Sequence, residues 1–103
     1  MKTNQIYHGD CLDLLPSILS KSVDMILCDL PYGTTACEWD SIIDMGQLWQ
    51  QYERIIKDNG AIVLTACNEF TFQLWQSKPS LFRYRWILLS HCFYLERRGK
   101  CYE

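Results

Sequence analysis

The sequence predicts a small α/β domain with a mostly parallel sheet. Two apolar runs, Val23–Cys28 and Ala61–Thr65, have the length and the β-branched content of buried strands. Between them lies Asp44–Lys57, in which apolar residues recur at helical spacing. Strands that alternate with helices favour parallel pairing and right-handed crossovers. At 103 residues the chain forms at most one small domain, and few complete α/β enzymes are this short.

The first part of the chain fits a strand and a helix placed before the first apolar run. Ile6–His8 is a short strand candidate, which Gly9-Asp10 ends. A helix then fits Cys11–Leu19, with Asp10 as its cap and with leucine and isoleucine residues along one face. Pro16 lies inside this pattern, so we expect it to kink or split the helix.

The rest of the chain continues the alternation. We expect Asp44 to cap the central helix, Gln47 to be placed for a capping box, and Asn59-Gly60 to end the helix. The stretch before this helix is too long for a simple connector, which is typical of functional or mobile loops. The remaining predicted elements are a helix that begins at Asn68 or Glu69, a break at Lys78-Pro79-Ser80 and a strand over Arg83–Leu89.

Composition bounds the class of protein. No apolar run reaches the roughly 18 residues of a spanning helix, and the N-terminus lacks the apolar core of a signal peptide. A cytoplasmic protein that does not enter a membrane is therefore the expectation. The six cysteines have no paired C-x-x-C spacing, so we expect reduced thiols. His8 and Cys11 form a lone H-x-x-C pair, which is too few ligands for a zinc site, and no metal is expected.

The most informative stretch is Asp29-Leu30-Pro31-Tyr32-Gly33, which directly follows the first apolar run. In open α/β sheets, ligands bind at the carboxyl ends of the strands. Pro31 fixes its own φ and pushes Leu30 into an extended conformation, so the Leu30 carbonyl has no helical partner and can face a ligand. With the carboxylate of Asp29 and the flat ring of Tyr32, it suits a planar amine, such as the exocyclic amino group of a nucleobase. The alternative is a proline turn in which Tyr32 only packs.

This turn resembles the Asp-Pro-Pro-Tyr motif of the amino-methylating DNA methyltransferases. The longer string from Asp29 to Asp40 resembles a subgroup of that family that is common in phages and prophages. The resemblance covers roughly residues 4–87 and implies a Rossmann-like, S-adenosylmethionine-dependent methyltransferase fold. It also implies the reaction, in which a methyl group moves from S-adenosylmethionine to an amino nitrogen of double-stranded DNA, on a base flipped out of the duplex.

The resemblance assigns catalytic roles to four residues. The carboxylate of Asp29 and the carbonyl of Leu30 accept the hydrogens of the target amine, Pro31 shapes the turn, and Tyr32 stacks on the flipped base. Aspartate at the head of the motif favours adenine-N6 as the target, because family members that act on cytosine-N4 more often have serine there.

The cofactor site is implied by the same resemblance. An acidic residue that follows the first strand of the family contacts the adenine amino group of the cofactor, and Asp10 takes that position here. The role of Asp10 as a helix cap is an alternative that does not exclude this one. Asp29 also borders the cofactor. Trp39 and Asp40 shape the mouth of the site, or Trp39 is a hydrophobic lid over the loop.

One part of the family pattern is missing. Many relatives carry a Phe-x-Gly-x-Gly cofactor motif near the C-terminus, and no two of the five glycines here are close enough to form it. We interpret residues 1–86 as the N-terminal, target-base part of a methyltransferase domain, and residues 87–103 as a divergent or out-of-frame tail. The tail is basic, which suits phosphate contacts or simple solvation. The open alternatives are a truncated adenine-N6 enzyme, a cytosine-N4 fragment, and an inactive fragment that binds DNA or a partner weakly. A small α/β binding protein with a chance motif is a further alternative, and the oligomeric state stays open.

Overall fold

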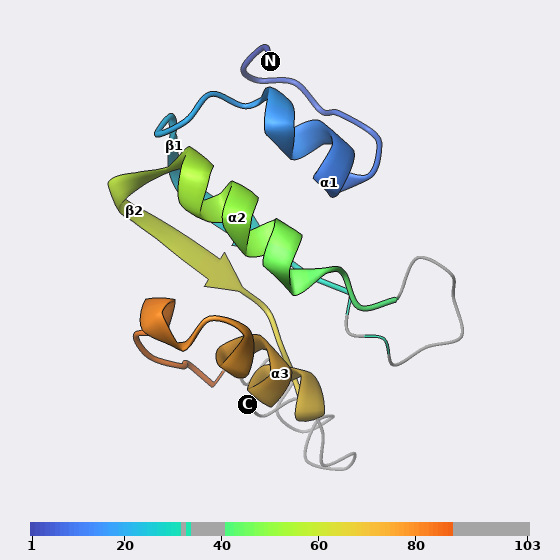
Figure 1. The fold of residues 1–103 in the computed structure, drawn as a ribbon, viewed down its shortest axis with the longest axis vertical. Helices are drawn as coiled ribbons and strands as arrows, with labels where there is room; N and C mark the ends of the chain where they lie inside the picture. The colour runs from blue at the N-terminus through green and yellow to red at the C-terminus, as the bar shows by residue number, and fades with distance from the viewer. Residues whose placement is uncertain (32, 34–40, 88–103) are drawn as a thin grey trace. The chain divides into compact units, whose positions relative to one another are not determined.

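A computed structural model describes residues 1–31, 33 and 41–87 of the chain. These residues confirm the α/β class (Figure 1). The chain divides into two compact units, of which the first comprises Met1–Cys28 with Asp44–Leu64 and the second Asp29–Ile43 with Thr65–Glu103. The elements in chain order are α1 (Cys11–Leu14), the 3₁₀ helix η1 (Leu15–Ser17), β1 (Val23–Cys28), α2 (Met45–Ile55), β2 (Ile56–Leu64), α3 (Glu69–Ser77) and the 3₁₀ helix η2 (Pro79–Leu81).

In the first unit, β1 and β2 form a two-stranded parallel sheet, as the alternation of elements predicts. Met25 pairs with Ala61 and Cys28 pairs with Leu64, so the two strands finish side by side. Helix α2 lies on the chain between the two strands and crosses one face of the pair (Figure 1). The carboxyl ends of both strands therefore meet at one edge of the sheet, which is the edge where α/β proteins place their ligands.

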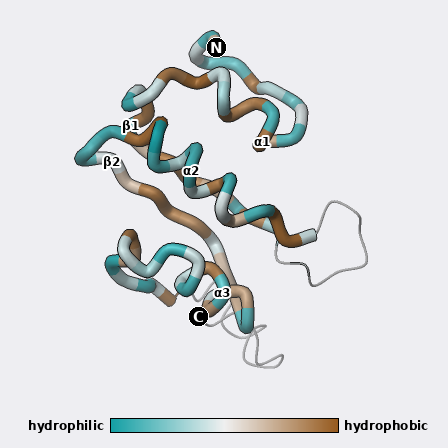
Figure 2. The backbone as a smooth tube through the Cα atoms, viewed as in Figure 1, coloured by the Kyte–Doolittle hydropathy of each residue, from teal (hydrophilic) through white to brown (hydrophobic). Residues whose placement is uncertain are grey.

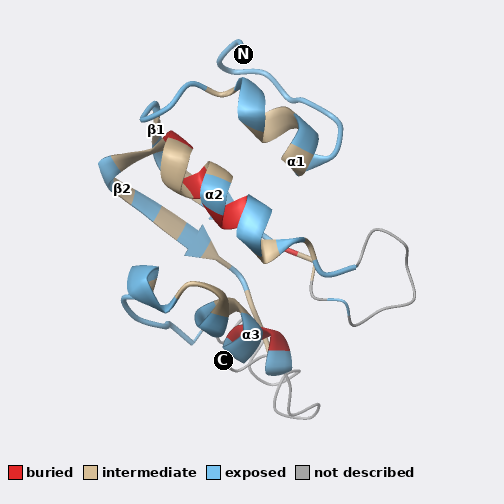
Figure 3. Cartoon of the chain, viewed as in Figure 1, coloured by how far each residue is buried: buried red, intermediate tan, exposed pale blue. Residues whose placement is uncertain are grey.

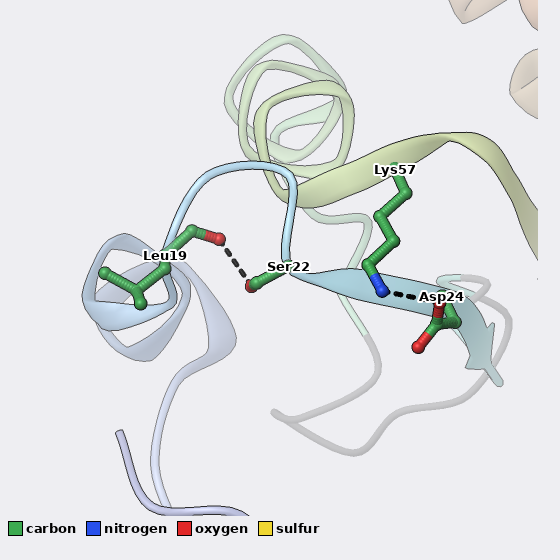
Figure 4. Close-up of polar contacts among 4 residues, drawn as sticks. All are labelled: Leu19, Ser22, Asp24 and Lys57. Carbon is green, nitrogen blue, oxygen red and sulfur yellow. Dashed lines mark hydrogen bonds and ion pairs between the residues drawn. The ribbon is translucent and has the colours of Figure 1, made fainter.

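The boundary between α2 and β2 differs from the predicted one. The helix ends at Ile55, and residues 57–60 belong to β2 instead of finishing the helix. The register shifts here. Val23 pairs with Ile56 and Met25 pairs with Ala61, so Asp24 alone lies opposite residues 57–60 of β2. Lys57 Nζ lies 2.8 Å from Asp24 Oδ1 across the irregularity (Figure 4). The pairing of Ile56 with Val23 and of Ala61 with Met25, on either side of this stretch, thus places it in the strand rather than in the helix.

The core of the first unit is one face of α2. The side chains on that face are spaced as the sequence predicts, and Trp49 and Tyr52 meet edge to face with ring centroids 5.9 Å apart. Asp44 caps the helix as expected, since its Oδ1 accepts the amide of Gln47. The Gln47 side chain donates to Asp44 Oδ2 rather than completing a capping box through the backbone. The buried residues of α2 are Leu48, Trp49, Tyr52 and Ile55 (Figure 3).

The strands are less buried than their apolar sequences predict. Apolar residues fill the second half of β2, as Figure 2 shows, but only alternate residues there are partly shielded from solvent. Met25, Leu27 and Val63 are 52%, 70% and 38% exposed. Leu27 pairs with Val63 in the register, so these side chains share one face of the sheet. The prediction of fully buried strands is therefore wrong within the described residues, because α2 covers only one face of the pair.

The N-terminal segment corrects a second prediction. Ile6–His8 is not a strand, and Ile6 is fully exposed. An isolated extended segment has no neighbour to take up its backbone hydrogen bonds, and neither β1 nor β2 pairs with it. The predicted split of the next helix at Pro16 is confirmed, since α1 ends at Leu14 and continues only as the 3₁₀ turn η1.

The second unit contains α3 and η2. Helix α3 begins after Asn68 and ends before Pro79, as the sequence predicts. Trp75 of α3 stacks on Phe82 with ring centroids 4.2 Å apart. Arg83–Leu89 was expected to be a strand, but residues 83–87 form none, and residues 88 and 89 lie outside the described part. The physical reason is that no strand of the described chain pairs with this segment, which leaves Trp86 77% exposed.

Candidate functional site

The motif predicted to carry the chemistry begins where β1 ends. Asp29 directly follows Cys28 and is exposed. Its Oδ1 atom accepts a hydrogen bond from Oγ1 of Thr65 at 2.5 Å. Thr65 directly follows Leu64, the last residue of β2, and Leu64 pairs with Cys28. Because the strands are parallel and Cys28 pairs with Leu64, Asp29 and Thr65 each follow the end of one of two neighbouring strands. Their side chains form the hydrogen bond there.

Thr65 is a site residue that reasoning from the sequence missed. It was assigned only as the last residue of a strand, whereas the structure makes it the hydrogen-bond partner of the candidate catalytic carboxylate. The sequence signal that could have found it is a hydroxyl residue at the end of a strand parallel to the one that carries Asp29.

The residues after Asp29 anchor the turn. Leu30 is 4% exposed, and Pro31 is half-buried. A buried leucine directly after an exposed carboxylate fixes the backbone from which that carboxylate projects. Tyr32, the expected stacking residue, lies outside the described residues, as do Trp39 and Asp40.

Position 33, shortly after Asp29, requires a glycine. Its φ is +75°, a conformation that side chains other than glycine rarely adopt. A Cβ atom added there would lie 2.9 Å from Cγ1 of Ile42. Both the dihedral angle and the close approach of Ile42 therefore require glycine at this position.

The loop from β2 to α3 holds a strained residue. Asn68 has φ 55° and ψ −137°, and it stands at the N-cap of α3 without a side-chain hydrogen bond to the helix. Its Nδ2 atom is instead directed to Sγ of Cys67 at 3.9 Å. Such dihedral angles cost about 1–3 kcal/mol and persist where the surrounding structure determines them. The loop that supplies Thr65 is thus held in one unusual conformation.

Asp10, the expected cofactor ligand, lies in the first unit and caps α1. Its Oδ1 atom accepts the amide of Leu12 at 2.9 Å, which confirms the predicted cap. Partial burial is the largest cause that raises the pKa of the Cys11 thiol. The charge of Asp10 and the interaction with Cys28 raise it further.

Tyr52 belongs to the same part of the first unit. Burial, together with a hydrogen bond to the side chain of Cys28, raises the pKa of the Tyr52 phenol well above its ordinary value. The phenol therefore stays protonated and links α2 to the end of β1. Cys11, Cys28 and Cys67 are in the reduced form.

Two further features concern metals and membranes. Among residues 1–31, 33 and 41–87, no three His, Cys, Asp or Glu side chains are grouped so that they could hold a metal ion. Within the same residues, no helix has both the length and the apolar character that crossing a bilayer requires.

Comparison with known proteins finds a similarity to a methyltransferase. The chain is 28% identical over 97 residues to the type II methyltransferase M2.MboI of Moraxella bovis. The match covers 73% of this chain and 36% of that protein, so the chain spans little more than a third of the length of the curated relative that it matches. No protein-family model matches the chain. The similarity supports a relationship to methyltransferases.

Proposed function

We propose that this chain is the target-base part of a DNA adenine-N6 methyltransferase with a Rossmann-like fold. The observation that supports it best is an exposed carboxylate, Asp29, at the carboxyl end of a parallel strand, followed by the Leu30-Pro31-Tyr32 turn. The similarity to a type II methyltransferase supports the same class. In this proposal the substrate is double-stranded DNA, and residues 1–86 correspond to the N-terminal part of the domain.

The chemistry proposed for Asp29 is electrostatic. The lone pair of an exocyclic amine is delocalised into the base, so the nitrogen is a weak nucleophile. Hydrogen bonds from the amine to the Asp29 carboxylate and the Leu30 carbonyl favour a pyramidal nitrogen, and the carboxylate stabilises the positive charge that develops on it. Tyr32 holds the extruded base by stacking. The burial of Leu30 fits this role, because it fixes the backbone of the acceptor pair.

The cofactor implied by this reaction is S-adenosylmethionine. When bound, it would supply the methyl group. Asp10 fits a contact with its adenine amino group: the residue is exposed, and the hydrogen bond from the Leu12 amide to Oδ1 fixes the direction of the carboxylate. The sequence has no Phe-x-Gly-x-Gly loop, so we expect the 103-residue chain to transfer methyl groups far more slowly than a chain that has one.

The test is methyl transfer from labelled S-adenosylmethionine to mixed-sequence double-stranded DNA, followed by identification of the methylated nucleoside. N6-methyladenine supports the proposal, N4-methylcytosine favours the cytosine alternative, and transfer at a normal rate refutes the interpretation as an incomplete domain. The absence of any transfer favours the inactive fragment, which binding to a duplex with one unpaired adenine then tests.

The residue roles are tested by substitution. In a reconstructed chain that has the cofactor loop, Asp29→Ala is expected to lower the transfer rate about 10²–10³-fold, as for the loss of one preorganised transition-state partner. Asp24→Ala removes an equally exposed carboxylate from β1 and is the matched control, expected to leave the rate unchanged. Tyr32→Ala should weaken base binding by about 1–3 kcal/mol, whereas Tyr32→Phe keeps the ring and should be mild. An active Asp29→Ala variant, or equal damage by both substitutions of Tyr32, would show that the roles are wrongly assigned.

A further inference from the structure

We propose that Thr65 is a positioning residue that holds the Asp29 carboxylate in the orientation in which it receives the target amine. The identity of the amine rests on the proposed function, whereas the contact between the two side chains does not. Thr65 has no role in the motif from which the function is inferred.

The contact is a hydrogen bond from a hydroxyl to a carboxylate oxygen. Thr65 Oγ1 donates to Asp29 Oδ1 at 2.5 Å, across a separation of 36 residues in the chain. Hydrogen bonds in which a hydroxyl donates to a carboxylate are shorter and stronger than those between neutral groups. Because a carboxylate offers about four acceptor positions on its two oxygens, the bond to Oδ1 restrains that oxygen and leaves acceptor positions for a ligand.

Both partners project from backbone that is itself fixed. Asp29 stands between the end of β1 and the buried side chain of Leu30. Thr65 directly follows β2, and three residues later the same loop contains the strained backbone of Asn68. Threonine is also β-branched and therefore stiff at χ1, so the position of its hydroxyl is largely preset. An exposed aspartate without such a partner would sample several rotamers, and only some of them would direct its oxygens at a ligand.

Two substitutions of similar size distinguish a positioning role of Thr65 from a purely structural one. Thr65→Val keeps the branched shape and removes the hydroxyl, whereas Thr65→Ser keeps the hydroxyl and removes a methyl group. A purely structural role of Thr65 at the end of β2 predicts that valine, the better strand residue, is tolerated at least as well as serine. A positioning role predicts the opposite order for every property that depends on the orientation of Asp29.

The first measurement uses the 103-residue chain without a ligand. The Hα–Hβ couplings of Asp29, measured by NMR, report whether its side chain occupies one rotamer. We expect one rotamer in the wild type and in Thr65→Ser, and averaged couplings in Thr65→Val. The proposal is overturned if Thr65→Val leaves the couplings unchanged, or if the wild type already shows averaging. Thermal melts of each variant verify that the chain remains folded.

The second measurement is binding to a duplex with one unpaired adenine, against the same duplex with an abasic position. Thr65→Val should weaken the adenine-dependent binding about tenfold, Thr65→Ser about twofold or less, and Thr65→Val added to Asp29→Asn should cause little further loss. Ser22→Ala, which removes a hydroxyl bonded to the Leu19 carbonyl in the first unit, should have no effect (Figure 4). Equal losses in the serine and valine variants overturn the positioning role. One combination of results separates the two proposals. If the wild type binds both duplexes equally well but Thr65→Val loses the single Asp29 rotamer, the proposed function is refuted and the positioning role stands.

Discussion

Replacing Arg54 tests which interaction holds the N-terminal segment on the rest of the first unit. Arg54 is half-buried near the end of α2. Its Nη1 atom donates to the carbonyl of Ile18 at 2.8 Å and to Oγ of Ser20 at 3.1 Å, and its Nη2 atom donates to the carbonyl of Leu15 at 3.0 Å. Its Nε atom donates to Oε1 of Gln51 at 3.0 Å. One guanidinium thus satisfies backbone carbonyls at the point where η1 ends.

The expected magnitude follows from what Arg54→Met leaves behind. Two backbone carbonyls lose a charged donor, and each such bond contributes about 1–1.5 kcal/mol after allowance for partial exposure to water. The methionine retains most of the apolar stem, so the loss of packing is small. We therefore expect the free energy of unfolding to fall by about 2–3 kcal/mol, which corresponds to roughly 10 °C or more in Tm for a domain of this size. Arg54→Lys should lose about half as much, since one ammonium cannot reproduce the fork of the guanidinium.

The assay is urea and thermal unfolding followed by circular dichroism. Lys57→Met is the matched control, because it also replaces one cation by methionine but removes only the exposed ion pair with Asp24. Exposed pairs contribute about 0–1 kcal/mol, so this control should melt near the wild type. If Arg54→Met melts within about 2 °C of Lys57→Met, the hydrogen bonds of Arg54 do not hold the segment and the reasoning is wrong.

Two further predictions concern stability. Gly60→Ala should destabilise the chain by about 1–3 kcal/mol in urea unfolding, because the new Cβ would lie 2.7 Å from Cγ1 of Ile56 and 2.9 Å from the carbonyl oxygen of Asp24. Gly46→Ala, where Cβ would meet only Asp44 Oδ1 at 3.4 Å on the surface of α2, should be neutral or stabilising, and equal effects of the two would contradict the clash. Raising the pH above about 10 should lower the stability by up to about 1.4 kcal/mol per pH unit, because Tyr52 stays protonated in the folded chain while its unfolded form ionises. Urea unfolding at pH 9 and 11 measures this slope, which should be smaller in Tyr52→Phe; an unchanged slope would exclude Tyr52 as its source.

The sequence by itself determined the local structure of this protein. The spacing of apolar residues predicts α2, Asp44 and Asp10 act as caps because their side chains accept amides within the next three residues, and Pro16 splits its helix because it has no N–H. It also predicts that Asp29 follows a strand of a parallel pair, because the apolar run and the turn chemistry adjoin each other in the chain. All of these features depend on residues within about one turn of each other or on a simple alternation of elements.

Only the tertiary structure decided features that depend on distant partners. Whether Ile6–His8 and residues 83–87 become strands depends on a neighbouring strand, and the described chain supplies none. Residues 57–60 lie in β2 rather than α2 because the residues on either side of them, Ile56 and Ala61, pair with β1. Thr65 meets Asp29 because the parallel register aligns Cys28 with Leu64, a pairing that no local pattern encodes. The sequence thus predicts the candidate carboxylate, Asp29, whereas its contact with the Thr65 hydroxyl depends on long-range strand pairing.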